Sequence, residues 1–434
     1  MTSKLSPQSA FVWMWLPGET SPVIAGRLVQ DGPTLKFNYG KSYLERTPKI
    51  SLYTPELPLK AGSIEPLPGL KMPGCIRDGA PDAWGRRVII NRKYGKKGDQ
   101  IDSDSLSELS YLLESGSDRI GALDFQSSET YKPRDTEGVS LEALMQAADL
   151  VERGLPLPLD LDKALYHGTA IGGARPKALI NEEERKYIAK FSSTSDTYSV
   201  IKAEYIAMRL AALAGLKVAN VKQVKAAHKD VLLIERFDRV KVKKGWARKS
   251  IISVLTMLHL DENVARYASY QDLAEIIRQD FDSATPTLKE LFSRIVFNIL
   301  CGNTDDHARN HAAFWNGSQL SLTPAYDICP QTRTGGEVNQ AMSILGQDRR
   351  SQLSLCLEAA EEVFMLSRNH ALEIIEHITK TIRDNWSTIC QEAEVSPVDE
   401  SLFKSRQFFN PYAFEGLDGS ESHLIKHLHD FKKS

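Results

Sequence analysis

The spacing of apolar residues changes along the chain, and this change constrains the fold more than any other feature. Within the first forty residues, apolar side chains form short strand-like runs separated by the turn pairs Pro17-Gly18 and Asp31-Gly32. These runs are residues 11–16, 23–30 and Thr34–Tyr39. From residue 271 onward, the spacing is helical over most of the chain. Strands followed by helices predict an α+β fold with two lobes.

The region after the first strands mixes both patterns. Pro81 suits a first helical position, and helical spacing follows as far as residue 94. A helix at residues 105–114, a strand at residues 121–125 and a helix at Leu141–Glu152 are also predicted, the last with Ser140 as its N-cap. The stretch Gly-Leu-Pro-Leu-Pro-Leu-Asp at residues 154–160 is typical of a linker. We therefore expect a domain boundary near this stretch.

Beyond the linker, strands return before the helices take over. The predicted elements are a hairpin over residues 178–180 and 187–191, a helix over 200–214, strands over 218–225 and 231–237, and an apolar helix over 286–300. Gly215 is placed to end the first of these helices. The chain is thus expected to divide into residues 1–155, 156–240 and 241–434, of which the last part is mainly helical.

Composition excludes some classes of protein. The chain is 42% hydrophobic and 25% charged, which is ordinary globular usage. A formal net charge of −2 argues against a chain that binds bare nucleic acid by charge alone. The first ten residues lack a signal-peptide core, and no apolar run reaches the roughly 20 residues that span a bilayer. Five scattered cysteines without a C-x-x-C pair fit reduced thiols, so we expect a cytoplasmic protein without membrane contact.

The strongest functional signal is the run Gly302-Asn-Thr-Asp-Asp-His-Ala-Arg-Asn310, followed by Thr323-Pro-Ala-Tyr-Asp-Ile328. Asp305 and Asn310 are five residues apart, as in the catalytic loop of protein kinases. In that loop, the aspartate accepts the proton of the substrate hydroxyl and the asparagine holds a magnesium ion. Asp327 follows a predicted hairpin, where kinases place a second metal-binding aspartate. Mg²⁺ is a hard ion that prefers such oxygen ligands.

Each of these residues alone would more often be a helix cap or a turn former. Further features in kinase order strengthen the kinase interpretation. Gly172 and Gly173 lie in a turn before a strand, where backbone N–H groups can approach phosphate oxygens closely. Lys190 lies among apolar residues on a predicted strand, and Glu204, fourteen residues later, either pairs with it or faces solvent. Residues 232–238 then suit a hinge between lobes.

Four motifs carry a resemblance to the HipA toxin kinases. They are Gly173-Ala-Arg-Pro-Lys177, Glu235-Arg-Phe-Asp-Arg239, Asn303-Thr-Asp-Asp-His-Ala-Arg-Asn310 and Tyr326-Asp-Ile328. Residues 77–86 and 110–125 are similar to the N-terminal subdomain of that family. The resemblance covers most of the chain and implies a bilobal protein-kinase-like α+β fold. Residues 1–155 would then be the N-terminal subdomain, 156–240 the ATP-binding part, and 241–434 the lobe with the catalytic loop.

The resemblance also implies a role for each candidate residue. Asp305 would be catalytic, Asn310 and Asp327 would bind magnesium, and Lys190 would contact phosphate. The remaining nucleotide-binding residues would include Glu204 and His307. The phosphate loop would comprise Gly172, Gly173, Ala174, Arg175 and Lys177, and the adenine hinge would contain Glu235 and Phe237. The family uses ATP and Mg²⁺ to phosphorylate a protein such as an aminoacyl-tRNA synthetase, which halts growth. Its partner is a helix-turn-helix antitoxin of the HipB type, through which it contacts DNA.

Two positions depart from the family pattern. Asp306 stands where relatives commonly carry glycine, and it adds negative charge beside the phosphates unless it points away or assists the metal. Ala170 stands where relatives carry an autophosphorylated serine, although Thr169 is adjacent. These departures leave two alternatives open, a nucleotide-binding regulator without phosphotransfer and a kinase of small molecules. A metallohydrolase using His307 and His311 is disfavoured, because no glutamate stands between them to activate water.

Overall fold

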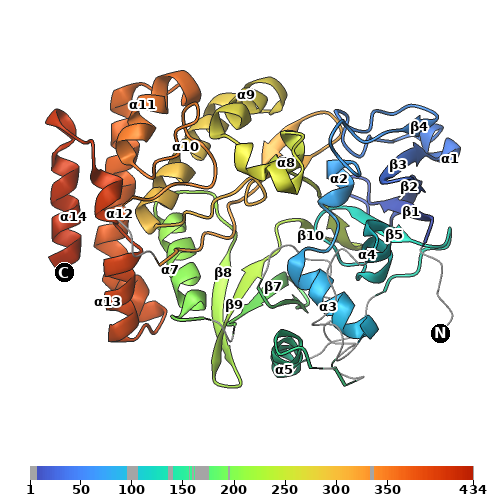
Figure 1. The fold of residues 1–434 in the computed structure, drawn as a ribbon, viewed down its shortest axis with the longest axis horizontal. Coiled ribbons are helices and arrows are strands. Elements are labelled where there is room, and N and C mark those ends of the chain that lie inside the picture. The colour runs from blue at the N-terminus through green and yellow to red at the C-terminus, as the bar shows by residue number, and fades with distance from the viewer. Residues whose placement is uncertain are drawn as a thin grey trace. The chain divides into compact units, whose positions relative to one another are not determined.

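The computed structural model describes residues 7–94, 106–134, 140–155, 157–158, 161, 175–193, 196–332 and 337–433. Figure 1 shows the course of the chain. It forms two compact units, each built from several segments of the sequence. The first unit contains residues 1–195, 224–252 and 314–318, and the second contains residues 196–223, 253–313 and 319–434. Strands dominate the first unit and helices the second, so the predicted α+β class is confirmed.

The N-terminal sheet of the first unit has five strands in the order β4-β3-β2-β1-β5. Its strands are β1 (Ser9–Met14), β2 (Val23–Asp31), β3 (Thr34–Tyr39), β4 (Ser63–Ile64) and β5 (Leu123–Gln126). The first three are the strands predicted from the alternating pattern. Gly32 adopts φ +55° in the turn between β2 and β3, as its place in that turn requires. Short helices α1 (Lys41–Leu44), α2 (Gly74–Arg77) and α4 (Glu108–Glu114) complete this part.

A second sheet of four strands has the order β6-β7-β9-β8. These strands are β6 (Lys177–Asn181), β7 (Lys186–Phe191), β8 (Val221–Ala226) and β9 (Lys229–Glu235). Helices α3 (Ala83–Tyr94) and α5 (Leu141–Glu152) bury apolar residues against one face of it, among them Trp84, Val88, Leu144 and Val151. The Ser140 side chain caps α5 as predicted, accepting from the Ala143 amide. The hairpin β10 (Arg239–Val242) and β11 (Gly245–Arg248) and strand β12 (Ser250–Ser253) follow.

The second unit is mainly helical. Its helices are α7 (Val200–Leu213), α8 (Val254–Met257), η4 (Glu262–Tyr267), α9 (Tyr270–Asp280), α10 (Ala284–Cys301), α11 (Leu353–Phe364), α12 (Arg368–Glu392), α13 (Pro397–Arg406), η5 (Pro411–Phe414), η6 (Gly419–Glu421) and α14 (His423–Lys433). Helix α10 is central, because it contacts α9, α11 and α12. Strands β13 (Ala312–Trp315) and β14 (Leu320–Leu322) form the predicted hairpin. Among the described residues, no helix is long and apolar enough to cross a membrane.

Helix α10 ends at Gly302, which leads the chain into the candidate catalytic loop. Gly302 adopts φ +74°, the left-handed conformation that suits glycine at a helix end. A Cβ atom there would also lie 2.5 Å from the Gln407 carbonyl oxygen. The Gly302 carbonyl in turn accepts from the Gln331 amide at 3.0 Å. Both the conformation and the close packing therefore require glycine at the start of the loop.

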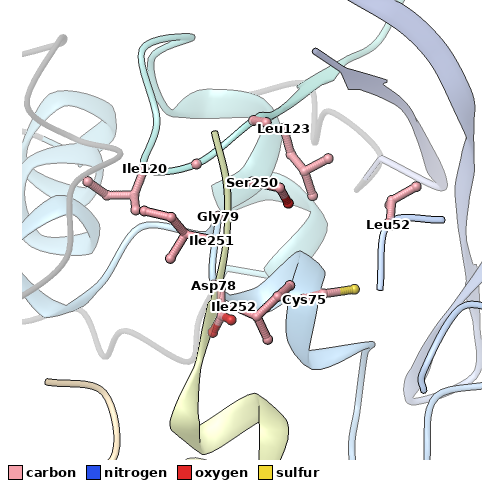
Figure 2. A pocket seen from close by; sticks show the side chains of 11 residues that line it. Leu52, Cys75, Asp78, Gly79, Ile120, Leu123, Ser250, Ile251 and Ile252 are labelled. Atoms are coloured by element: carbon pink, nitrogen blue, oxygen red, sulfur yellow. The ribbon is translucent and has the colours of Figure 1, made fainter. Parts of the chain in front are cut away.

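A small cavity lies inside the first unit, between helix α2 and the residues that precede β5 (Figure 2). Cys75 and Asp78 line it from α2 and its end, and Ile251 and Ile252 line it from β12. Its volume of about 10 Å³ corresponds to at most one water molecule. This cavity is far too small for a nucleotide, and it contains none of the candidate site residues.

Candidate active site

The loop after α10 presents Asp305 to solvent. Its backbone is closed by two hydrogen bonds, from the His307 amide to the Asp305 carbonyl (2.9 Å) and from the Asn310 amide to the His307 carbonyl (2.8 Å). The Asn310 side-chain nitrogen donates to the Asp305 carbonyl oxygen at 3.1 Å. A cation would therefore bind the amide oxygen of Asn310. The Asp305 side chain is exposed, whereas Asn310 is buried and His307 is half-buried.

Asp306 points the other way, into the core of the second unit. Its side chain is buried and accepts hydrogen bonds from the Tyr270 hydroxyl and from His311 Nε2, the latter at 2.8 Å. These three residues form the Asp306 cluster. Burial alone would raise the pKa of Asp306, but the charge and hydrogen bond of His311 and the Tyr270 hydroxyl outweigh it and lower the pKa. The extra carboxylate of this loop therefore contributes to the scaffold rather than to the exposed surface.

Asp327 lies just beyond the β13–β14 hairpin, on a segment that is fixed at several points. The Ala325 amide donates to the Lys217 carbonyl at 2.7 Å, and the Tyr326 hydroxyl donates to the Arg309 carbonyl at 2.8 Å. Asp327 itself adopts φ +59°. A non-glycine residue in this left-handed conformation is uncommon, although aspartate adopts it more readily than most residues. The fixed neighbours hold the Asp327 backbone in this conformation.

Two buried lysines lie opposite each other in the second sheet of the first unit. Lys177 on β6 pairs in register with Lys190 on β7, so both side chains lie on the same face. This face is opposite to the one that packs on α3 and α5, because Ala178 and Ala189 belong to that apolar core. Like charges directly opposite each other are destabilising. The Asp82 carboxylate lies 3.8 Å from Lys177 Nζ and offsets part of this charge.

Glu204 lies on α7 in the second unit and is only 1% exposed. The alternative of a solvated glutamate on the helix surface is therefore wrong. Helix α7 is joined to the end of α12 through Glu392, which accepts hydrogen bonds from the Tyr205 hydroxyl and from Arg209 Nε, the latter at 2.8 Å. The carboxylate of Glu392 also contributes to raising the pKa of Tyr205 to about 12, after burial, which has the larger effect.

Glu235 ends strand β9, and its carboxylate accepts from Arg185 at 3.1 Å. The Phe237 ring, two residues later, meets the Phe314 ring edge-on with centroids 5.9 Å apart. Neither of these two contacts tests the predicted role of Glu235 and Phe237 at an adenine hinge, which stays a prediction. Arg175 and Lys177 are the described members of the predicted phosphate loop, and Gly172, Gly173 and Ala174 lie outside the described residues, as do Thr169 and Ala170.

The residues around Phe237 form a buried ionic group that sequence reasoning missed. Asp118 Oδ1 accepts from Arg236 at 3.0 Å and from Arg239 at 2.7 Å, and Asp238 Oδ2 accepts from the same two side chains at 2.8 Å each. We call Asp118, Arg236, Asp238 and Arg239 the arginine–aspartate cluster. The only signal in the sequence is the alternation of arginine and aspartate directly after a buried strand. Asp118 belongs to the N-terminal part of the chain, so the cluster joins distant segments.

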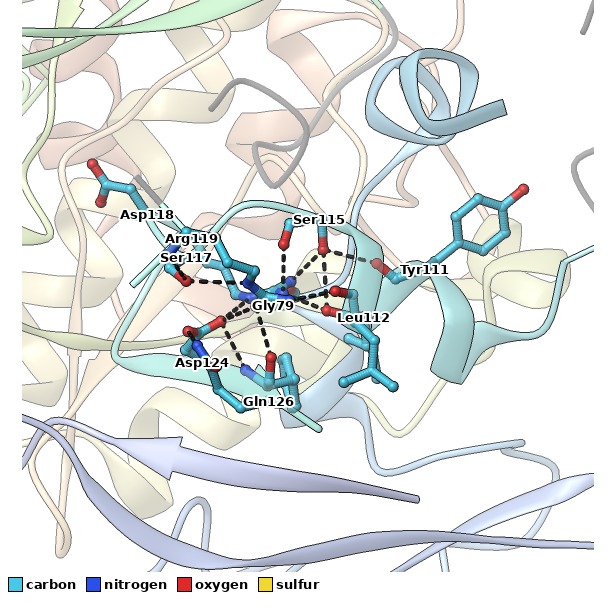
Figure 3. Close-up of polar contacts among 12 residues, drawn as sticks. Gly79, Tyr111, Leu112, Ser115, Ser117, Asp118, Arg119, Asp124 and Gln126 are labelled. Carbon is cyan, nitrogen blue, oxygen red and sulfur yellow. Dashed lines mark hydrogen bonds and ion pairs between the residues drawn. The ribbon is translucent and has the colours of Figure 1, made fainter. Parts of the chain in front are cut away.

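Arg119 extends this polar core on the other side of Asp118. It is fully buried and donates to Asp124 at 2.9 Å, to Ser115 Oγ at 2.8 Å and to the Gly79 carbonyl at 3.0 Å. Figure 3 shows these acceptors gathered around its guanidinium. Burial alone would raise the pKa of Asp124, but Arg119 and Arg134 outweigh it and lower the pKa. The N-terminal sheet is thus held by ion pairs as well as by apolar packing.

The donor set of the second unit fits a hard cation better than a soft one. Asp305, Asn310 and Asp327 offer carboxylate and amide oxygens, which Mg²⁺ prefers. Among the described residues, no group of three His, Cys, Asp or Glu side chains could hold a metal ion without the help of other groups. All five cysteines are free thiols, and four of them are buried. Any divalent ion at this loop would therefore also depend on oxygens from the nucleotide.

The sequence matches two family models, which together span most of the chain. A model described as HipA-like C-terminal domain matches residues 169–386, and one described as HipA N-terminal domain matches residues 19–126. In structure, the chain resembles HipA from a complex of Shewanella oneidensis MR-1 HipA, HipB and operator DNA, with a TM-score of 0.64 over 98% of this chain and 96% of that one. The two are 18% identical, so this likeness shows the fold alone.

Curated relatives match more weakly in sequence. The serine/threonine-protein kinase toxin HipA of Shewanella oneidensis is 25% identical over 183 residues, or 37% of this chain. Proteins of Sinorhizobium fredii and Haemophilus influenzae are 27% and 28% identical over 32% and 37% of this chain, and their names contain the word kinase. The matches span 33%, 42% and 52% of the three relatives' own lengths, so this chain aligns with a third to about half of each.

Proposed function

Because the chain belongs to the HipA family, we propose that it is an ATP- and magnesium-dependent serine/threonine protein kinase that acts as a growth-inhibiting toxin. The observation that best supports this proposal is the opposite orientation of two adjacent carboxylates. Asp305 is exposed, whereas Asp306 is held in the core by Tyr270 and His311. The loop is thereby built to present one carboxylate, as a protein kinase requires.

Asp305 would act on the acceptor hydroxyl. A carboxylate within hydrogen-bond reach orients the hydroxyl oxygen and accepts its proton as the bond to phosphorus forms. The loop hydrogen bonds that join Asp305, His307 and Asn310 reduce the freedom of this carboxylate before the substrate arrives. Such a fixed position lowers the entropy lost in reaching the transition state.

Asn310 and Asp327 would hold the metal, and Lys177 and Lys190 would face phosphate oxygens. A magnesium ion supplies positive charge that offsets the charge on the transferring phosphoryl group. The left-handed backbone of Asp327 and the buried lysine pair are the two features of the chain that support these roles. Two lysines in register on one buried face are suited to bind an anion, because both ammonium groups attract its negative charge.

The burial of Asp306 also bears on the alternative of a regulator that binds nucleotide without transferring phosphate. That alternative drew on a second carboxylate close to the phosphates, and the Asp306 side chain lies in the core instead.

The protein substrate and the partner belong to the same proposal. We propose a helix-turn-helix antitoxin as the partner, with DNA contacted only through it. Tight, salt-sensitive binding of DNA by the chain alone in a mobility-shift assay would contradict this.

Asp305→Asn tests the proposed activity most directly. The substitution keeps the shape of an exposed side chain, so we expect an unchanged melting temperature and a loss of phosphoryl transfer of about 100-fold or more. Transfer is measured with γ-labelled ATP, purified protein and a cell extract. Asp282→Asn, another exposed aspartate of the second unit, is the matched control and should retain full activity. Full activity in Asp305→Asn would overturn the proposal.

A further inference from the structure

The short helix η4 is an ordered surface element with no buried residue. Tyr267 is 60% exposed and Val264 is 36% exposed, although both carry large apolar side chains. The helix is nevertheless well formed, because the Asp261 side chain caps it by accepting from the Asn263 amide at 3.0 Å. Packing into a core does not explain why this segment keeps two exposed apolar side chains.

The segment that contains η4 is fastened to the catalytic loop at three points. Before η4 in the chain, the Leu255 amide donates to the Ala308 carbonyl at 3.1 Å. Glu262, the first residue of η4, forms an ion pair with Arg309 at 2.7 Å. After η4, the Tyr270 hydroxyl donates to Asp306. All three partners lie within four residues of Asp305, so η4 is held beside the loop that presents the candidate catalytic carboxylate.

Two cations on this surface lack a carboxylate to offset their charge. Arg266 donates to the Tyr267 hydroxyl at 3.1 Å and lies over its ring, 5.0 Å from the centroid. Arg349 donates to the carbonyl oxygens of Arg266 (3.0 Å) and Ala341 (3.2 Å). Among the described residues, both guanidiniums thus contact groups without net charge. By contrast, Arg309 is paired with Glu262 on the same surface.

We propose that η4 and Arg349 form the docking surface for the acceptor segment of the substrate protein, and that this surface selects an acidic residue together with an apolar one. The inference rests on the proposed kinase function. The acidic side chain would pair with Arg266, with Arg349 adding positive charge beside it, and the apolar one would pack on Tyr267 and Val264. Tyrosine and arginine are the side chains that most often dominate binding energy at protein interfaces.

Charge and reach both favour an extended protein segment as the occupant. Glu262 and Asp348 are themselves paired with Arg309 and Arg350, so Arg266 and Arg349 are the cations of this surface that an acidic side chain of a protein segment can pair with. An extended peptide advances about 3.3 Å per residue. Because Glu262 of η4 pairs with Arg309 of the loop, a segment whose hydroxyl lies at Asp305 would bring residues close to the acceptor over η4.

A positional-scanning library of serine peptides tests this selection. The wild-type protein should phosphorylate peptides with Asp or Glu near the serine at least about tenfold faster than their Ala counterparts, since charge-assisted pairs with Arg are strong. Arg266→Glu should abolish that preference and favour Lys or Arg instead. Tyr267→Ala should raise the KM for apolar-containing peptides about tenfold and leave the KM for ATP unchanged. Arg406→Glu, an exposed arginine on α13, is the matched control and should keep the wild-type preference.

The outcomes separate this inference from the proposed function. The wild type could label extract proteins and yet show no preference for acidic residues in the peptide library. That result would overturn the docking surface and leave the kinase function intact. The same holds if Arg266→Glu keeps the wild-type preference, or if extract proteins are labelled and no library peptide is. The absence of any labelling, in the extract as well as the library, would instead contradict the kinase function itself.

Discussion

Each unit of the protein buries a polar group, and the arginine–aspartate cluster and the Asp306 cluster are built from different chemistry. The first places two carboxylates between two guanidiniums, with the Gly121 amide also donating to Asp238 at 2.8 Å. The second surrounds one carboxylate with a phenol and an imidazole. The first joins segments more than a hundred residues apart in the chain, whereas the second lies mostly within one loop.

This difference suggests that the two clusters have different tasks. Arginine stays charged at all ordinary pH values, so removing any member of the arginine–aspartate cluster leaves a buried charge without compensation. Its task is to fix the N-terminal part of the chain against the residues after β9. The Asp306 cluster contains a histidine and a neutral hydroxyl, and it carries less fixed charge. Its task is to orient a loop, because holding Asp306 inside turns Asp305 outward.

Asp238→Ala should cause the largest loss of stability and is therefore the strongest test of this difference between the clusters. Removing one partner of a buried ion pair typically costs about 3–5 kcal/mol, and Asp238 serves two arginines and a backbone amide. The free energy of unfolding can be followed by tryptophan fluorescence in urea, with hydrogen exchange to separate the two units. Glu65→Ala is the matched control in the same unit, since Glu65 lies on the surface and its pair with Lys36 is screened by solvent, so the variant should unfold much like the wild type. A loss for Asp238→Ala as small as the control's would contradict the role of the cluster.

The arginine–aspartate cluster should also make the first unit sensitive to acid. Burial alone would raise the pKa of Asp238, but Arg236 and Arg239 outweigh it and lower the pKa to about 2, from its ordinary value of 3.8. A lowered carboxyl pKa contributes stability that is complete above the ordinary value and is lost as the pH falls toward the folded value. The stability of the wild type should therefore decrease between about pH 4 and pH 2, by about 1.4 kcal/mol per pH unit for each proton taken up.

Asp238→Asn isolates the part of this acid sensitivity that comes from one group. The free energy of unfolding of the variant should decrease less steeply over the same pH range, because its amide takes up no proton. Urea unfolding at several pH values between 2.5 and 5, read in peptides of the first unit by hydrogen exchange, measures the slope. If the free energy of unfolding depends on pH in the same way in both proteins, Asp238 takes up no proton on unfolding in this range.

Much of the fold could be predicted from the sequence, because local patterns determine it. Strand β3 and helix α5 have the predicted bounds, and Gly215 follows α7 with φ +83°, as a residue that ends a helix should. Partners distant in the chain could not be predicted in this way. The pairing of Asp118 with Arg236 spans 118 residues, and no periodicity reports such a contact.

The candidate site was predicted by residue type, whereas side-chain orientation was not. Asp305 and Asp306 are adjacent and identical, and only the position of Tyr270 and His311 decides which one is buried. Glu204 is a second case. A solvated position for Glu204 requires an exposed face on helix α7, but ten of its fourteen residues are buried. The polar residue on such a helix is enclosed by tertiary packing, which spacing alone does not reveal.

Tyr270→Phe probes the weaker cluster and should have a smaller effect than Asp238→Ala. The substitution removes one donor to the Asp306 carboxylate and keeps the ring, whose edge-on contact with His311 has centroids 5.7 Å apart. A hydrogen bond to a charged group contributes about 1.5–3 kcal/mol, and His311 still pairs with Asp306, so we expect a loss near 2 kcal/mol.

The comparison with Tyr326→Phe sharpens this last prediction. The Tyr326 hydroxyl donates to a neutral acceptor in the same loop, the Arg309 carbonyl at 2.8 Å, and a neutral hydrogen bond contributes only about 1 kcal/mol. We therefore expect Tyr270→Phe to destabilise the second unit about twice as much, as read by hydrogen exchange in its peptides. Phosphoryl transfer by Tyr270→Phe should fall by less than about tenfold, because the His311 hydrogen bond still keeps Asp306 inside and Asp305 exposed. Equal losses of stability in the two variants would mean that Asp306 is not charged in the folded protein.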